Sequence, residues 1–289
     1  MSSAIVTIAF SVATTLGALR GLEAVPEDPF PTDVPPAARV LLANAKAELR
    51  DLATSLLHDQ SADAKLAAAN VQRAMTEALN AAGALEACDS QYGNLEAPKI
   101  TSAGDDLVAV VVDLAIPCGD DASLFLFRHD AGGWHLVLDR ERNDYETVAG
   151  GAGGLEYRVS APDEHGSYLV LVSDINPWCI SMWQAIRWEV FRLNRGWRDP
   201  EKVADGYDSI YLDSDLKLEV TPDTFGLEYT GSSIDSGRVM RDYHRHYRVL
   251  PGNRLPCRSA ILPSAFLPCI ASLLSLRQKQ PERRPGAWC

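Results

Sequence analysis

Residues 107–116 read LVAVVVDLAI, and this stretch decides the fold class. It is rich in β-branched side chains, contains neither glycine nor proline, and is followed at once by Pro117. Such a run favours a β-strand, because branched side chains pack well on a pleated surface. It is the longest of a series of similar runs, so the chain is predicted to have a β-rich body.

The runs on the C-terminal side of this strand have the same character. They are short, rich in aromatic and β-branched residues, and separated by turn-forming clusters such as DAGG (130–133), PDEHG (162–166) and TPD (221–223). Closely spaced turns imply antiparallel meanders rather than strand–helix–strand units. We therefore expect residues 92–250 to form a mainly β domain, an antiparallel meander arranged as a sandwich or in a propeller-like way.

Two parts of this domain resemble each other. Phe127-Arg128 and Gly133-Trp134 in the first correspond to Phe191-Arg192 and Gly196-Trp197 in the second. Each copy reads as a strand, a glycine turn and a tryptophan that begins the return strand. The similarity predicts two related hairpins within one β architecture.

The region before the β domain has a different organisation. Residues 37–85 show helical periodicity with alanine-rich faces and predict an α-helical hairpin, which packs on the β domain or on another chain. Residues 25–36 are rich in proline and acid and predict a linker. Residues 1–24 form a possible signal peptide.

The signal-peptide interpretation rests on an apolar run from Ala4 to Leu19, with Ala18 or Ala24 as a small residue suited to cleavage. The basic segment that usually precedes such a run is missing, because Arg20 is the first positive side chain. A first strand or a buried helix is the alternative. With export favoured, the expected location is secreted or periplasmic.

The net charge of −12 argues against binding to nucleic acid or to an anionic membrane surface. No stretch approaches the roughly 20 apolar residues of a confident membrane span, so no integral membrane span is expected. No motif for a cofactor is present, and none is predicted.

The cysteines raise a question of crosslinking. Cys118 and Cys179 each lie at a proline-marked strand end, where loops from distant parts of a β domain meet. In an exported protein this placement favours a Cys118–Cys179 disulfide, with a buried free thiol as the alternative. The pairing of the remaining four is left open: Cys88, Cys257, Cys269 and Cys289.

Tryptophans are dense around the second of these cysteines. Trp188 shares a strand face with Ile186 and Val190 and is expected in the core. Asn176, Trp178 and Trp183 lie at a loop and a strand start, where they predict an exposed surface for a protein or carbohydrate ligand. A noncatalytic binding or interaction module is therefore the leading functional hypothesis.

A hydrolase of polysaccharide or ester substrates is the alternative hypothesis. Asp242, His244 and His246 alternate along a predicted strand and share one face, so a metal site there is conceivable, although a solvated strand near a sheet edge has the same pattern. Acidic residues also gather in turns, Asp139 and Glu141 among them, where solvated charges are the ordinary interpretation.

The segment 251–289 differs from the rest of the chain in being basic, proline-broken and cysteine-rich. It reads either as a basic docking segment for the acidic body or as the product of a shifted reading frame. Three motifs resemble an uncharacterised family of exported bacterial proteins over residues 95–250. They are LAIPCGDDASLFLFR (114–128), GGWHLVLDRERNDYE (132–146) and INPWCISMWQAIRWEVFR (175–192). Members of that family usually end in an acidic, aromatic segment, which favours the frame-shift interpretation; the resemblance implies no activity.

Overall fold

The computed structural model describes residues in nine ranges: 3–21, 34–86, 92–117, 119–141, 154–177, 183–196, 199–211, 215–232 and 240–249. The chain divides after Ser259 into two units, and the second lies wholly outside the described residues, as does the whole segment 251–289. All six cysteines also fall outside these ranges, so the Cys118–Cys179 disulfide stays a prediction.

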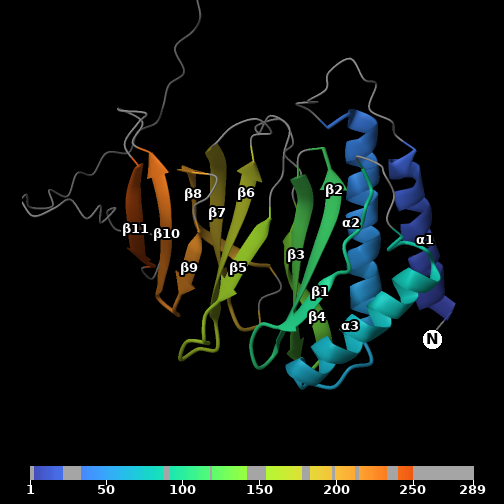
Figure 1. The fold of residues 1–289 in the computed structure, drawn as a ribbon. Coiled ribbons are helices and arrows are strands. Elements are labelled where there is room, and N and C mark those ends of the chain that lie inside the picture. The colour runs from blue at the N-terminus through green and yellow to red at the C-terminus, as the bar shows by residue number, and fades with distance from the viewer. Residues whose placement is uncertain are drawn as a thin grey trace, which may run out of the picture. The chain divides into compact units, whose positions relative to one another are not determined.

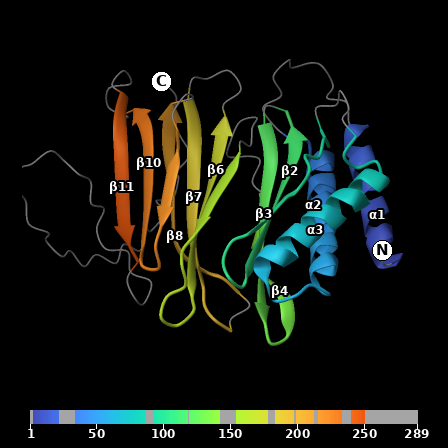
Figure 2. The same cartoon turned by 60° about the horizontal axis from the view of Figure 1, so that its bottom comes forward.

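Among the described residues, three helices precede the β domain: α1 (Ser3–Arg20), α2 (Pro36–Leu57) and α3 (Ala64–Ala81). Helix α2 begins with proline, whose fixed φ suits a first helical turn. Helix α3 is capped by Asp63, whose carboxylate accepts the backbone N–H groups of Lys65 and Leu66. The predicted helical hairpin is confirmed, and α3 crosses α2 obliquely (Figures 1 and 2).

Helix α1 is the one helix among the described residues that is long and apolar enough to cross a membrane. Signal sequences near an N-terminus share that length and composition. Its inward residues Val12, Leu16 and Leu19 are fully buried against the other helices. The predicted linker falls mostly outside the described residues, apart from Val34 to Pro36, where α2 begins.

The first sheet is antiparallel and four-stranded, in the order β1-β2-β3-β4. Its strands are β1 (Lys99–Ser102), β2 (Leu107–Ile116), β3 (Gly119–Asp130) and β4 (Gly133–Arg140). Strand β2 is the LVAVVVDLAI run, and β3 is buried along most of its length. Strand β4 forms one edge of the sheet.

The second sheet is antiparallel and seven-stranded, in the order β11-β10-β8-β7-β6-β5, with β9 added to β10. Its strands are β5 (Leu155–Val159), β6 (Tyr168–Pro177), β7 (Trp183–Leu193), β8 (Glu201–Tyr211), β9 (Lys217–Val220), β10 (Thr224–Ser232) and β11 (Met240–Arg248). The mainly β antiparallel fold is thereby confirmed, and the strands in the described part of the chain form two sheets rather than propeller blades.

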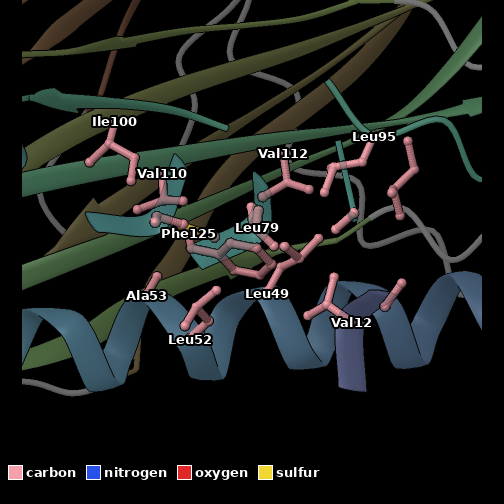
Figure 3. Packing of buried hydrophobic residues seen from close by; sticks show 14 of the residues in the cluster. Val12, Leu49, Leu52, Ala53, Leu79, Leu95, Ile100, Val110, Val112 and Phe125 are labelled. Carbon is pink, nitrogen blue, oxygen red and sulfur yellow. The ribbon is translucent and has the colours of Figure 1, made fainter. Parts of the chain in front are cut away.

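The four-stranded sheet is the middle layer of this arrangement. On one face, Val110, Val112 and Phe125 pack against the helices, as the close view of this core shows (Figure 3). On the other face, Ala109, Leu124 and Leu126 pack against the seven-stranded sheet. A strand buried on both faces needs apolar residues at successive positions, which explains the run from residue 107 to residue 112 of β2.

The other face of the seven-stranded sheet has a core of its own. Residues of β6 to β10 contact one another there. Strand β10 pairs with β8 only near Gly231, and β9, which pairs with β10, lies close to β5 and β6. Trp188, Phe225 and Tyr247 form an aromatic cluster in this core, with Phe225 and Tyr247 stacked 4.7 Å apart. Trp188 is thus a core residue, as its strand pattern predicts.

Candidate functional site

A groove of about 960 Å³ opens where β4 ends beside the exposed part of the seven-stranded sheet. Its walls come from three places: the end of β4, the neighbouring strands β6 and β7, and β8 beyond them. The residues that line it are Asp139, Arg140, Glu141, Asp174, Arg187, Trp188, Glu189, Phe191, Asp205, Gly206 and Tyr207. Five of these are carboxylates, three are aromatic and two are arginines.

The groove exists because the four-stranded sheet covers only part of its neighbour. Near the start of β6 and the end of β7, Val170, Val172 and Leu193 are buried under the four-stranded sheet. Farther along the same face the apolar residues give way to Asp174 and Arg187, which are paired in register. Cross-strand partners share a face, so the change from apolar to charged marks where the cover stops.

Arg140 spans the groove from the end of β4 to the facing sheet. Its Nη2 donates a hydrogen bond to Asp174 Oδ2, and its Nε donates to Glu189 Oε2 at 2.5 Å. Burial would lower the pKa of the Arg140 guanidinium, but the two carboxylates beside it raise that pKa overall. A guanidinium held by two carboxylates through different nitrogens is a rigid, preorganised group at the floor of a site.

The second oxygen of Glu189 is also engaged. Lys202 Nζ, on β8, lies 3.1 Å from Glu189 Oε1 and 3.7 Å from Asp205 Oδ1. Burial acts to raise the pKa of Glu189, but Arg140 and Lys202 outweigh it and lower that pKa. Glu189 is therefore an ionised carboxylate with a cation on each side.

The wall formed by β4 continues into the helical layer. Arg50 of α2 lies 2.8 Å from Asp139 and 3.5 Å from Glu141. Burial, and next to it the charge of Asp139, raises the pKa of Glu141. Behind this wall Lys46 and Asp121 form a fully buried ion pair at 3.1 Å. Charged residues thus run from the groove into the core between α2 and the four-stranded sheet.

Aromatic residues complete the groove. Tyr207 is 52% exposed, so its ring is free to contact a ligand. The indole of Trp188 lies directly over Gly206, its register partner on β8, so closely that a Cβ at that position would overlap the ring. Glycine is therefore required at residue 206 by close approach, and Trp188 is held in place beneath the groove.

The predicted binding residues lie at the neighbouring end of the β6–β7 pair. Asn176 is paired with Ala185, and Trp183 with Tyr211, so both backbone positions follow Asp174 and Arg187 along the same strands. Trp178 and Cys179 lie outside the described residues, as does Cys118. The structure thus puts two of the three predicted positions on strands that also form the groove.

Asp242, His244 and His246 lie on one face of β11, as their spacing predicts, and that face is exposed. Two of them contact different residues of β10: Thr230 donates a hydrogen bond to Asp242 at 2.8 Å, and the Glu228 carboxylate lies 3.0 Å from the His244 ring. Within the described ranges no group of three His, Cys, Asp or Glu side chains is placed to hold a metal ion. The pattern here is that of a solvated edge strand.

Sequence reasoning missed Arg140, Asp174, Arg187 and Glu189, which form the floor of the groove. Their signal was a charged residue in the middle of an otherwise apolar strand, as in VLVSDI and AIRWEVF. Alternation alone places such residues on the face away from the core. It does not tell which of these faces becomes a groove, because that depends on where a second sheet ends.

The chain matches no family model, no curated protein and no solved structure. The resemblance to an exported bacterial family therefore stays a prediction, and function has to be argued from the groove.

Proposed function

We propose that this protein is an exported, noncatalytic binding protein that holds a neutral, hydroxyl-rich ligand, the chemistry of a carbohydrate, in the groove of Arg140 and Tyr207. The observation that carries the proposal is the Arg140 ion-pair network at the floor of a cavity of about 960 Å³. That volume lies at the upper end of the range of small-molecule sites, roughly 300–1,000 Å³.

The charges of the groove support a neutral ligand. Five carboxylates line it against two arginines, which disfavours an anion. The central charges compensate one another, since Arg140 contacts Asp174 and Glu189, and Lys202 contacts Glu189. Carboxylates accept hydrogen bonds from hydroxyl groups, and an exposed ring such as Tyr207 offers a flat apolar surface to a sugar.

The same contacts support binding without catalysis. A catalytic carboxylate needs either a free lone pair or a proton to give, at a position that the substrate reaches. Glu189 is ionised, and each of its oxygens already accepts a hydrogen bond, one from Arg140 and one from Lys202, which makes it a poor general base. Export is supported by the apolar helix α1 near the N-terminus, whose length and composition suit a signal sequence.

The test is a glycan-array screen of the purified full-length protein, followed by calorimetric titration with the best oligosaccharide. We expect Tyr207→Ala and Asp205→Asn to weaken binding by about tenfold or more, since each removes a contact worth about 1.4 kcal/mol. Asp242→Asn is the matched control for Asp205→Asn, because it changes an exposed aspartate on β11, away from the groove. Equal affinity in the groove variants and the wild type, or no glycan bound, contradicts the proposal.

A hydrolase is the second candidate, and one observation favours it. Glu141, with a raised pKa, and Glu189, with a lowered pKa, line the same groove, and carboxylates with opposite shifts are typical of acid and base pairs. Release of reducing ends from a bound polysaccharide, abolished in Glu141→Gln, would establish this activity. Binding with no release in the wild type leaves the noncatalytic function.

A further inference from the structure

Helix α1 is built into the helical layer of this protein on one whole side. Val12, Leu16 and Leu19, spaced three to four residues apart, are fully buried and belong to the same core as Leu49 and Leu52 of α2. Val12 lies against α2 in this core (Figure 3). A segment that is removed after export has no need of a matched, closed surface on the folded protein.

Polar contacts fix the end of α1 as well. The Arg20 guanidinium donates to the carbonyl oxygens of Glu86 at 2.7 Å, Ala84 at 3.2 Å and Gly93 at 3.4 Å. These acceptors follow α3 and precede the first sheet, so one side chain ties α1 to both. Without Arg20, partly buried backbone carbonyls would lose their donor.

Glu48 of α2 is a second polar anchor. Its Oε1 accepts hydrogen bonds from Ser11 at 2.8 Å and from Thr15 at 3.1 Å. The other carboxylate oxygen, Oε2, is buried. Loss of α1 would remove both hydroxyl donors from this carboxylate.

The segment after α3 is shaped to receive α1. Gly93 has a φ of 78°, and a Cβ at this position would lie 2.8 Å from Cβ of Leu19. Glycine is therefore needed at residue 93 for two reasons: the left-handed backbone conformation and the close approach of helix α1. The contact links residues 19 and 93, which are far apart in the sequence.

From these contacts we propose that α1 is retained as a permanent structural element of the exported protein, and that neither Ala18 nor Ala24 is a cleavage site in the folded chain. No charged residue occurs from Ser3 to Leu19, and Thr7 and Thr14 donate to carbonyl oxygens one turn earlier in their own helix. The helix is thus apolar enough to act as a targeting segment and still has an inner face that packs after transfer.

The first experiment is intact-mass analysis of the full chain, produced with its own N-terminus in a bacterium and recovered from the cytoplasmic, periplasmic and external fractions. We expect a mass that includes α1 in the folded protein, whichever fraction holds it. A mass that begins after Ala18 or Ala24, on protein as heat-stable as the uncleaved chain, overturns the inference. The fraction itself tests the proposed export separately.

A pair of variants in α1 provides the second experiment. Leu16→Asp puts a charge on the buried face, whereas Phe10→Asp puts the same charge on the outer face, where Phe10 is 57% exposed. We expect Leu16→Asp to lower the thermal midpoint of the purified protein by about 5 °C or more, and Phe10→Asp to change it by about 1 °C or less. Recovery of folded Phe10→Asp but not Leu16→Asp has the same meaning.

A helix used only for targeting gives the opposite result. Both charges then impair export to a similar degree, because each interrupts the same apolar run, and neither changes the stability of the recovered protein. Arg20→Gln adds a milder test, with a midpoint reduced by about 2 °C or more through loss of its carbonyl contacts. An unchanged midpoint in both Leu16→Asp and Arg20→Gln rejects the retained helix.

Discussion

The β3–β4 and β7–β8 hairpins each contain a bulge, where the return strand has one residue more than its partner. In the first hairpin the extra residue is Val137, opposite Leu126 and Phe127. In the second it is Val203, opposite Val190 and Phe191. Both shifts lie next to the phenylalanine that the two similar sequence segments share. In each hairpin the extra valine and the residue after it are both buried. The first pair lies in the core between the two sheets, and the second lies in the core on the far face of the seven-stranded sheet. Two bulged hairpins of the same kind thus occur, one in each sheet.

The two hairpins differ in what covers them. The helices cover one face of β3 and the seven-stranded sheet covers the other, so β3 carries apolar residues on both faces. Strand β7 has one closed face, and on the other Phe191 and Leu193 pack against the four-stranded sheet while Arg187 and Glu189 line the groove. The same local structure therefore forms core where both faces are covered and forms a candidate site where the cover ends.

The largest effect is expected from the charge buried beneath the first hairpin. Asp121→Ala leaves Lys46 as a buried cation without its carboxylate, which typically costs about 3–5 kcal/mol. Lys46→Met combined with Asp121→Leu should recover most of that loss, because no charge is then buried. Denaturant unfolding measures both. A single variant within about 1 kcal/mol of the wild type would show that the pair is not desolvated as the structure has it.

The second prediction compares the equivalent phenylalanines of the two hairpins. Phe127→Ala should cost about 3–5 kcal/mol, since its side chain is fully buried and leaves a closed cavity. Phe191→Ala should cost about 2 kcal/mol, because Phe191 borders the groove and solvent can fill the space it leaves. Denaturant titration of the wild type and both variants gives the two losses in unfolding free energy, which can then be compared. Equal losses would mean that the second hairpin is as closed as the first.

These comparisons show how far the sequence predicts the structure. The run of 107–116 predicts a strand, and the two matched Phe-Arg segments predict the related hairpins. That both faces of this strand are covered is seen only in the structure. Arg140 could not be assigned from the sequence, since its partners Asp174 and Glu189 belong to another sheet. Strand patterns record which face is buried, whereas a groove depends on how far one sheet extends over another.

A third prediction concerns the strands that carry the groove, on the face that is turned away from it. Gly206→Ala forces the Trp188 indole to move and should cost about 1–3 kcal/mol, the usual range for overpacking. Gly154→Ala is the control, because a Cβ there meets nothing within 4 Å. Near-ultraviolet circular dichroism and thermal unfolding report the change around Trp188. If the two variants unfold alike, Trp188 does not depend on the space that Gly206 leaves.

The smallest expected effect concerns one carboxylate in each sheet, whose charges change the stability of the fold in opposite directions. Burial, followed by the charges of Asp113 and Glu96, raises the pKa of Asp120 in the first sheet, whereas Arg140 and Lys202 lower the pKa of Glu189 in the second despite its burial. The charged form of Asp120 thus opposes folding, and that of Glu189 favours it. At pH 7, Asp120→Asn should stabilise the protein by roughly 0.5 kcal/mol and Glu189→Gln should destabilise it by roughly 1 kcal/mol, allowing for solvent screening.

Acidification should remove both differences, for opposite reasons. As the pH falls through its raised pKa toward the ordinary value of 3.8, Asp120 takes up a proton in the folded protein and becomes as neutral as asparagine, so the advantage of Asp120→Asn disappears. The contribution of the Glu189 charge is full above its ordinary pKa of 4.5 and is lost as the pH falls through its lowered pKa, so the penalty of Glu189→Gln disappears there. Denaturant midpoints of the three proteins between pH 3 and 7 test both losses. If Asp120→Asn and Glu189→Gln change the stability at pH 7 in the same direction, the surroundings of the two carboxylates do not determine whether their charge favours folding.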